Sequence, residues 1–298
     1  MHIFHGTVGP PELHAQVDFR LTHRYIRIDD QSGFRGLDLA QLDGTVLALD
    51  WVVGKTHHIW GSAVMVAPGV ALTARHVVDH MRNEGFLGEE VGGYLLAIGF
   101  HNDGTAIWNP NNYYFGDGDL AILTLVRIPQ NASRDLAPTV NVATLVARQP
   151  LMGETISLIG FVAPERGEFE NDAALDLLGS VGPVIDLYPN GRGRSRPVPS
   201  AGVLAKIING MSGGAALDAQ GRLLGIITSG LDEEPSFISL SWPILFTPIE
   251  VAWPPGHFPE PTTLHAMAQL GFCRIECIEA LRSHVNESGE PLGVSLIL

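Results

Sequence analysis

The chain has 298 residues, of which 45% are apolar and 17% are charged, and its formal net charge is −14. A chain this acidic repels nucleic-acid phosphate, and no stretch reaches the roughly 18 uninterrupted apolar residues of a membrane helix, so neither nucleic acid nor a membrane is expected as a partner. The start, MHIFHGTVGPPELHAQ, lacks the basic and apolar regions of a signal peptide, and a secreted protein of this size would often carry several disulfides, so the sequence predicts a cytoplasmic protein.

Short apolar runs dominate the chain from about residue 46, whereas residues 1–45 match no motif. The runs are rich in Val, Ile and Leu and are bounded by Gly, Pro, Asn or Asp, as β-strands are. They read VLALDWVV, WGSAVMVA, VALTARHVV, YLLAIGF, LAILTLV, TISLIGFV, GPVIDLY, LLGIITSG and FISLSWPILF. No regular helical crossovers separate them, so the pattern favours an all-β barrel or sandwich over a doubly wound sheet.

The basic cluster in NGRGRSR contains Arg192, Arg194 and Arg196. It lies in a long segment, residues 164–200, that separates blocks with clearer motifs. Three arginines are too few for a nucleic-acid patch on a chain of this net charge. The cluster is therefore interpreted as a solvated loop.

The pattern changes after the proline-rich AWPPGHFPEP. TTLHAMAQLGF and CRIECIEALRSHV have helical spacing, which predicts a helical tail over about residues 262–286. Cys273 and Cys277 lie four residues apart in this tail and are interpreted as reduced, partly buried thiols. A metal site would need two further ligands, and His284 is the only nearby candidate, so neither a metal nor a cofactor is expected.

The segment INGMSGGAALDAQGRLLGIITSG carries the most informative motif. Ser212 lies in Gly210-Met211-Ser212-Gly213-Gly214, where glycines let the backbone bend sharply and expose the hydroxyl. They also let backbone N–H groups approach a substrate carbonyl, as an oxyanion hole requires. An ordinary serine in a glycine-rich turn has the same pattern, so the motif alone leaves both interpretations open.

A serine hydroxyl needs a base, and the base needs an orienting carboxylate. Among the twelve histidines, His76 stands out because it ends a predicted hairpin of two apolar strands, GSAVMVAPGVALTARHVV. Asp119 opens the apolar run DLAIL, where a buried charge would be costly without a partner. Asp117, two residues earlier, is its rival, but the apolar run that starts directly after Asp119 favours Asp119 as the buried residue. Asp119 could instead be an ordinary turn aspartate.

The three motifs, in the order His, Asp, Ser, resemble those of the trypsin-like, chymotrypsin-fold serine peptidases. The matching blocks are AxHV around His76, DLAIL at Asp119 and GxSGG around Ser212, and the resemblance covers roughly residues 46–250. GGAAL followed by a turn and LLGIIT is nearest to the bacterial high-temperature-requirement type. The resemblance implies a double six-stranded β-barrel at residues 46–254, flanked by an N-terminal extension (1–45) and a short helical extension (255–298).

The same resemblance implies a role for each site residue. His76 and Asp119 would lie on the first barrel and Ser212 on the second. Ser212 would attack the scissile carbonyl, His76 would accept its proton, and Asp119 would orient the imidazole. The N–H groups of Gly210 and Ser212 would bind the oxyanion. Met211 replaces the acidic residue that pairs with a newly cut N-terminus in secreted digestive members, so that activation route is not expected.

Substrate binding is also implied by the resemblance. Thr228-Ser229-Gly230 would pair with the substrate backbone as an added strand. Lys206, six residues before Ser212, would lie at the floor of the first specificity pocket and favour an acidic side chain. Lys206 could equally point to water, in which case Ile207 and Ile208 would line a small apolar pocket.

The sequence therefore predicts a serine endopeptidase that acts on protein or peptide substrates, with a narrow target or a regulatory protein partner. Two alternatives remain. The same glycines occur at the nucleophile elbow of α/β-hydrolase esterases, but a helix should then follow Ser212, and here a turn and an apolar strand follow. A trypsin-like domain could also be a non-catalytic binding or scaffold module.

Overall fold

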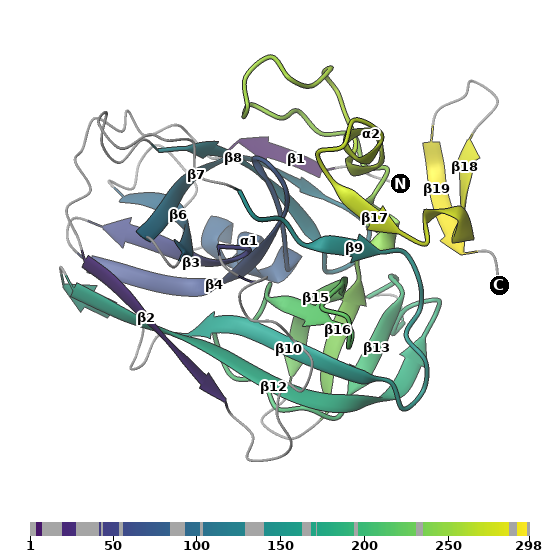
Figure 1. The fold of residues 1–298 in the computed structure, drawn as a ribbon, viewed down its shortest axis with the longest axis horizontal. Helices are drawn as coiled ribbons and strands as arrows, with labels where there is room; N and C mark the ends of the chain where they lie inside the picture. Colours follow the sequence, from purple (N-terminus) through teal and green to yellow (C-terminus); the bar gives the residue numbers. More distant parts are fainter. Residues whose placement is uncertain are drawn as a thin grey trace.

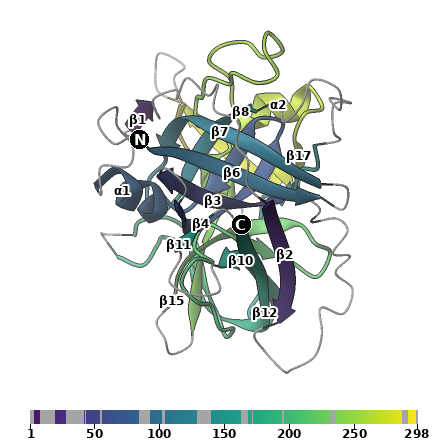
Figure 2. The same ribbon diagram turned by 90° about the vertical axis from the view of Figure 1, so that its left-hand side faces the viewer.

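The computed structural model describes a two-barrel molecule in which most of the chain forms β-strands (Figure 1). The described residues are 4–7, 20–27, 42, 44–53, 56–83, 93–101, 104–128, 140–162, 168–170, 172–193, 196–230, 235–285 and 291–296. Two strands from the first 45 residues, β1 (Phe4–Thr7) and β2 (Arg20–Arg27), add to the two barrels separately. Figure 2 shows β2 running along β12 of the second barrel.

The first barrel closes through six antiparallel strands. They follow the order β7–β6–β3–β4–β5–β8, and pairing of β7 with β8 completes the ring. Their bounds are β3 Val46–Val53, β4 Thr56–Ala67, β5 Val70–Thr73, β6 Gly93–His101, β7 Gly104–Phe115 and β8 Ala121–Arg127. The apolar runs of the sequence fill this barrel, and β3 is buried from its start to Val52.

The second barrel also closes through six antiparallel strands, in the order β14–β10–β12–β13–β16–β15. Their bounds are β10 Thr155–Val162, β12 Asp172–Tyr188, β13 Ser200–Val203, β14 Ala215–Leu217, β15 Leu223–Gly230 and β16 Ser236–Leu240. Two short strands extend its sheet in parallel, β9 (Thr144–Val146) and β17 (Arg274–Glu276), and β11 (Glu168–Glu170) crosses to pair with β4. The predicted double six-stranded barrel is confirmed.

Two predicted strands end earlier than the sequence suggests. The run VALTARHVV forms β5 only as far as Thr73 and then turns into helix α1 (Arg75–Asn83), so His76 lies in the first turn of a helix and not at a strand end. FISLSWPILF forms β16 and then the 3₁₀ turn η2 (Trp242–Ile244). Pro243 lacks a backbone N–H, which disfavours continuation of the strand there.

The predicted helical tail is confirmed in part. A short helix, α2 (Leu264–Gln269), begins after Thr263, whose hydroxyl accepts a hydrogen bond from Ala266 N–H (3.0 Å), and the backbone reverses at Gly271 (φ +82°). The second half of the tail is not helical. It forms β17, the 3₁₀ turn η3 (Ile278–Ala280) and the hairpin of β18 (Leu281–Val285) with β19 (Pro291–Leu296).

Backbone pairing with β9 explains why this part of the tail is a strand and not a helix. Through β9, β17 joins the sheet of the second barrel, whereas an isolated helix of this length has only marginal stability. Cys277 follows β17 with φ 59°, which no α-helix contains. Both cysteines are free thiols, with Cys273 buried and Cys277 half-buried. The amphipathic pattern of the tail also predicts that Leu281 and Val285 pack on the second barrel. Leu281 packs against the core, whereas the side chain of Val285 lies outside the described part of the structure.

A charged network ties the tail to the second barrel. Asp218 is fully buried in the β14–β15 turn and forms ion pairs with Arg222 (2.7 Å) and Arg148 (3.1 Å). Arg222 also reaches Glu276 in β17 (2.6 Å). Burial alone would raise the pKa of Asp218, but hydrogen bonds from Arg222 and Arg148 outweigh it, so that pKa is lowered.

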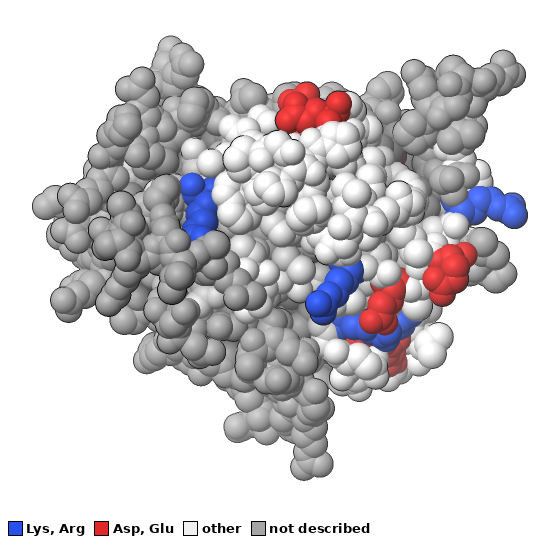
Figure 3. Space-filling model, turned by 45° about the horizontal axis from the view of Figure 1, so that its top comes forward, with Lys and Arg blue, Asp and Glu red and all other residues white. Residues whose placement is uncertain are grey.

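The described part of the face drawn in Figure 3 is mostly uncharged, and basic and acidic side chains touch at one place on it. Among the described helices, none has the length and apolar composition needed to cross a membrane.

Candidate active site

The loop that carries Ser212 joins β13 to β14 and needs glycine at two positions. Gly210 has φ +100° and Gly213 has φ +85°, values that favour glycine. A side chain at position 213 would also collide with the Ser62 carbonyl and the Thr73 hydroxyl. The GxSGG pattern therefore has a steric cause in this fold, and the resulting turn leaves Ser212 half-buried.

Two backbone N–H groups beside Ser212 are available to a ligand. Met211 N–H donates to Ile208 O (3.1 Å) and Gly213 N–H donates to Ile227 O (2.8 Å). In the described part of the chain, the N–H groups of Gly210 and Ser212 donate to no other group. Unpaired donors that flank a hydroxyl are the arrangement that an oxyanion hole requires.

Ser62 in β4 holds this loop from the first barrel, a role that the sequence motifs did not suggest. Ser62 is fully buried, and its N–H donates to Ser212 O (2.8 Å). Its hydroxyl donates to Gly210 O (3.1 Å) and accepts from Phe161 N–H of β10 (2.8 Å). Thr73 Oγ1 in turn donates to Ser62 O (2.7 Å). Both barrels therefore fix the backbone on either side of Met211.

His76 and Asp119 form a hydrogen-bonded pair on the first barrel. The Nδ1 atom of His76 lies 2.9 Å from Asp119 Oδ2, and the His76 backbone N–H donates to Asp119 Oδ1 (2.9 Å). The His76 side chain is 45% exposed and Asp119 is 13% exposed, so the carboxylate is shielded while the ring reaches solvent. Asp117 is exposed, so burial distinguishes the two aspartates as the sequence analysis anticipated.

Gly61 brings the His76 helix and the Ser212 loop into contact. A β-carbon at Gly61 would lie 2.9 Å from Ser212 O and 3.0 Å from the side chain of Val77, the residue after His76. Within the described residues, no hydrogen bond joins the His76 ring to Ser212. Hydrogen bonds between catalytic groups are often long without substrate and shorten when it binds.

The strand β15 offers an open edge next to Ser212. Hydrogen bonds to Gly213 and Gly214 occupy that edge only as far as Ile227. Beyond it, at Thr228-Ser229-Gly230, β15 pairs on its other edge with β16, and the described structure pairs no strand on the edge that faces the Ser212 loop. An extended peptide can add there by backbone hydrogen bonds.

The residues of the expected specificity pocket differ in exposure. The Lys206 side chain is exposed, while its carbonyl accepts a hydrogen bond from Ser180 Oγ (2.5 Å). Ile207 lies against Gly230, where an added β-carbon would come within 2.5 Å of its side chain. Ile208 is 39% exposed. An isoleucine, and not the lysine, therefore fills the space beside Gly230.

A second His–Asp pair lies in the first barrel, at residues that the sequence motifs did not single out. His57 Nδ1 is 2.6 Å from Asp50 Oδ2, and their side chains are 3% and 0% exposed. Burial raises the pKa of Asp50, against the effect of His57. Because a substrate cannot reach fully buried groups, this pair is structural.

The segment interpreted as a solvated loop is not fully solvated. Arg192 and Arg196 are half-buried, and their guanidinium groups donate to the hydroxyl of Ser229 at 3.3 and 2.6 Å. Arg192 also lies over the Phe237 ring, 3.7 Å from its centroid. The aromatic ring and the Ser229 hydroxyl hold both side chains against β15, which the sequence spacing alone could not indicate.

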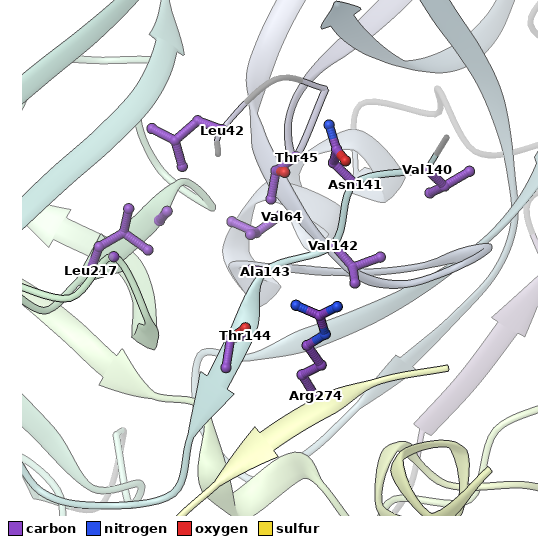
Figure 4. A pocket seen from close by; sticks show the side chains of 12 residues that line it. Leu42, Thr45, Val64, Val140, Asn141, Val142, Ala143, Thr144, Leu217 and Arg274 are labelled. Atoms are coloured by element: carbon purple, nitrogen blue, oxygen red, sulfur yellow. The ribbon is translucent and has the colours of Figure 1, made fainter. Parts of the chain in front are cut away.

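A cavity of about 460 Å³ lies between the barrels, where β9 and its preceding segment pass. Figure 4 shows Val64 of the first barrel, Leu217 of the second, and Arg274 of β17 around it. None of His76, Asp119 and Ser212 lines this cavity, so it is separate from the candidate active site.

One protein-family model matches this chain. The sequence model of the trypsin-like peptidase domain matches residues 61–226, which include His76, Asp119 and Ser212. No curated protein sequence matches the chain.

Similar solved structures include three proteases. The Rv3671c protease of M. tuberculosis in its active form is 14% identical, with a TM-score of 0.47 over 78% of this chain and 89% of that one. The HtrA-type protease AlgW with a tripeptide is 21% identical, with a TM-score of 0.45 over 70% and 60%. The serine endoprotease from Yersinia pestis is 18% identical, with a TM-score of 0.44 over 71% and 64%.

Proposed function

Since the chain belongs to the trypsin-like peptidase family, we propose that it is a serine endopeptidase with Ser212 as nucleophile, His76 as base and Asp119 as orienting carboxylate. The observation that carries the proposal is the hydrogen bond between His76 Nδ1 and the shielded carboxylate of Asp119 (2.9 Å to Oδ2). His76 lies on a helix that contacts the Ser212 loop through Gly61. A histidine held in this way presents its other ring nitrogen to a neighbouring hydroxyl.

The reaction would proceed in two steps. Ser212 Oγ attacks the scissile carbonyl carbon while His76 accepts the hydroxyl proton, and the N–H groups of Gly210 and Ser212 bind the oxyanion. His76 then donates that proton to the leaving amine, which leaves an acyl group on Ser212. Water, deprotonated by His76, hydrolyses the ester and regenerates the enzyme. Asp119 accepts the Nδ1–H of the ring throughout and stabilises its protonated form.

The proposal includes how the peptidase activity is controlled. Met211 is fully buried and carries no charge, so a newly cut N-terminal amine has no acidic partner at this position and activation by such a cut is not expected. We propose instead that the enzyme is controlled by a narrow set of protein targets or by a protein partner, and that it works in the cytoplasm. The side chain of Ile207 beside Gly230 favours a small apolar residue, such as Ala or Val, at the substrate position before the scissile bond.

A fluorophosphonate probe tests the proposal directly, because it labels a serine only when a neighbouring base and oxyanion hole activate it. Labelling of the full-length protein should occur at Ser212 and be absent from Ser212→Ala. Asp119→Asn should lower the labelling rate by about 10³-fold or more, whereas the matched Asp117→Asn should leave it unchanged. A wild-type protein that is folded and unlabelled at Ser212 would instead support the scaffold alternative.

A further inference from the structure

We infer that Arg192 and Arg196 form an anion-binding subsite beside the open edge of β15, which selects substrates with an Asp or Glu side chain within about three residues of the scissile bond, on the side that pairs with β15. This inference rests on the proposed function. It adds a requirement for substrate charge at a position separate from the pocket beside Ile207.

Backbone hydrogen bonds among the described residues hold both arginines between β12 and β13. Arg192 N–H donates to Arg196 O (2.8 Å), and Arg196 N–H donates to Gly193 O (3.2 Å). Gly191 N–H donates to Tyr188 O at the end of β12 (3.1 Å). The two arginines are therefore placed side by side by a hydrogen-bonded turn, which reduces the entropy lost when they bind a ligand.

Both guanidinium groups converge on one residue of the substrate-binding edge. The Ser229 hydroxyl accepts from Arg196 at 2.6 Å and from Arg192 at 3.3 Å, and Ser229 is the middle residue of Thr228-Ser229-Gly230. A strand advances about 3.3 Å per residue, so a peptide that pairs with these three residues brings about three of its side chains past this point. A long polar side chain of that peptide can reach the arginines.

The two positive charges have no carboxylate partner in the described part of the chain, where they form no ion pair. The Nε atom of Arg192 is buried and has no hydrogen-bond acceptor there. Burial lowers the pKa of Arg192, and the charge of Arg196 adds to that effect. Two cations that share a neutral hydroxyl repel each other, and a bound carboxylate would relieve that repulsion and supply the missing acceptor.

The arginines also lie close to the proposed catalytic pair. The negative charge of Asp119 raises the pKa of Arg192 and so opposes the effect of burial. Val198, shortly after Arg196 in the chain, packs against Gly118, the residue before Asp119. Asp119 accepts hydrogen bonds from both the ring and the backbone of His76 and forms no ion pair with either arginine. Within the described residues, the arginine site therefore holds no carboxylate at ion-pair distance.

The test compares peptides that differ only in Asp against Asn. A mixed-peptide library first identifies a cleaved sequence, and each position within three residues of its scissile bond is then made Asp or Asn. We expect the wild type to prefer Asp at one such position by about tenfold in kcat/KM, mainly through KM, with the preference falling as salt rises. Arg192→Gln combined with Arg196→Gln should abolish the preference, so that this variant cleaves the Asp and the Asn peptide with equal kcat/KM.

Arg82→Gln is the matched control, because Arg82 is a 49% exposed arginine at the end of α1 on the first barrel, and its variant should keep the full preference. A wild type without any Asp preference overturns the inference. So does a preference that survives in the double variant. A double variant that cleaves the Asn peptides faster also overturns it, since the arginines would then cover the edge of β15 instead of recognising an anion.

Binding to Ser212→Ala separates this inference from the proposed function. Fluorescence anisotropy measures recognition without cleavage, with labelled pairs of alanine-rich peptides that differ only in Asp against Asn and are chosen without reference to cleavage. If fluorophosphonate labelling fails while Asp peptides bind in an Arg192- and Arg196-dependent manner, the peptidase proposal is wrong and the subsite stands. If labelling and cleavage succeed without any Asp preference in either assay, the subsite is wrong and the peptidase proposal stands.

Discussion

Replacement of Ser62 by alanine should loosen the Gly210 side of the Ser212 loop. The Ser62 hydroxyl is fully buried, donates to Gly210 O and accepts from Phe161 N–H, so Ser62→Ala removes two hydrogen bonds and adds no bulk. The loss of the acceptor leaves the buried Phe161 N–H unpaired. One lost hydrogen bond costs about 1 kcal/mol and one orphaned buried donor about 1–3 kcal/mol, so the free energy of unfolding should fall by about 2–4 kcal/mol.

The expected thermal shift follows from the length of the chain. An unfolding entropy of about 2.1 cal/mol/K per residue over 298 residues gives roughly 0.6 kcal/mol per degree, so the Tm should fall by about 3–6 °C. The variant should therefore stay folded at 25 °C. Its kcat should fall by about tenfold or more, because the Gly210 carbonyl is no longer fixed and the adjacent oxyanion donor loses its orientation.

Ser241→Ala provides the matched control. Ser241 is 1% exposed and donates to one carbonyl, that of Leu224 (3.0 Å), in the second barrel. This variant should lose about 1 kcal/mol of unfolding free energy and keep the wild-type kcat. Thermal unfolding and steady-state cleavage of one peptide by all three proteins measure both effects. If Ser62→Ala retains the kcat of Ser241→Ala, then Ser62 does not position the oxyanion loop.

Four further predictions concern other parts of the molecule. Asp218→Asn should lower the free energy of unfolding at pH 7 by about 3 kcal/mol. Since the folded-state pKa of Asp218 is lowered, the stability that its charge contributes is present above about pH 4 and is lost as the pH falls further. The variant and the wild type should therefore converge in stability in acid, and parallel curves of stability against pH would contradict this. Burial raises the pKa of Cys273 to about 12, so only about one thiol in 10⁴ is ionised at pH 8, and iodoacetamide should modify Cys277 well before Cys273 in peptide mass spectra. A chain that ends at residue 254 loses the pairing of β17 with β9 and the Arg222–Glu276 ion pair, so it should melt below the full-length protein; an unchanged Tm would show that the tail contributes nothing. Library cleavage should occur after Ala or Val, because Ile207 lies beside Gly230; dominant cleavage after Asp or Glu would instead favour Lys206 as the floor of the pocket.

Local patterns in the sequence determined much of the architecture and pointed to the candidate site residues. VLALDWVV, TISLIGFV and LLGIITSG form β3, β10 and β15 with the bounds of those runs, because a short apolar run between turn residues is most stable when paired and buried. GxSGG indicated the glycine-rich turn that carries Ser212, because Gly210 and Gly213 adopt positive φ there. The helical pattern of LHAMAQ likewise predicted α2, because the capping residue Thr263 before it and Gly271 after it are local signals for the two ends of the helix.

Tertiary contacts decided which site residues meet and which form the tail adopts, because both depend on residues far apart in the chain. Asp119 reaches His76 across 43 residues, a contact that no local pattern can show. The stretch from Cys273 has helical spacing and still forms a strand, since the backbone of β9 supplies hydrogen bonds that outweigh a weak local preference. Ser229 and Arg196 are 33 residues apart and meet only because the β12–β13 connection lies over β15. Their contact, and the role proposed for the arginines, could therefore not be inferred from the sequence alone.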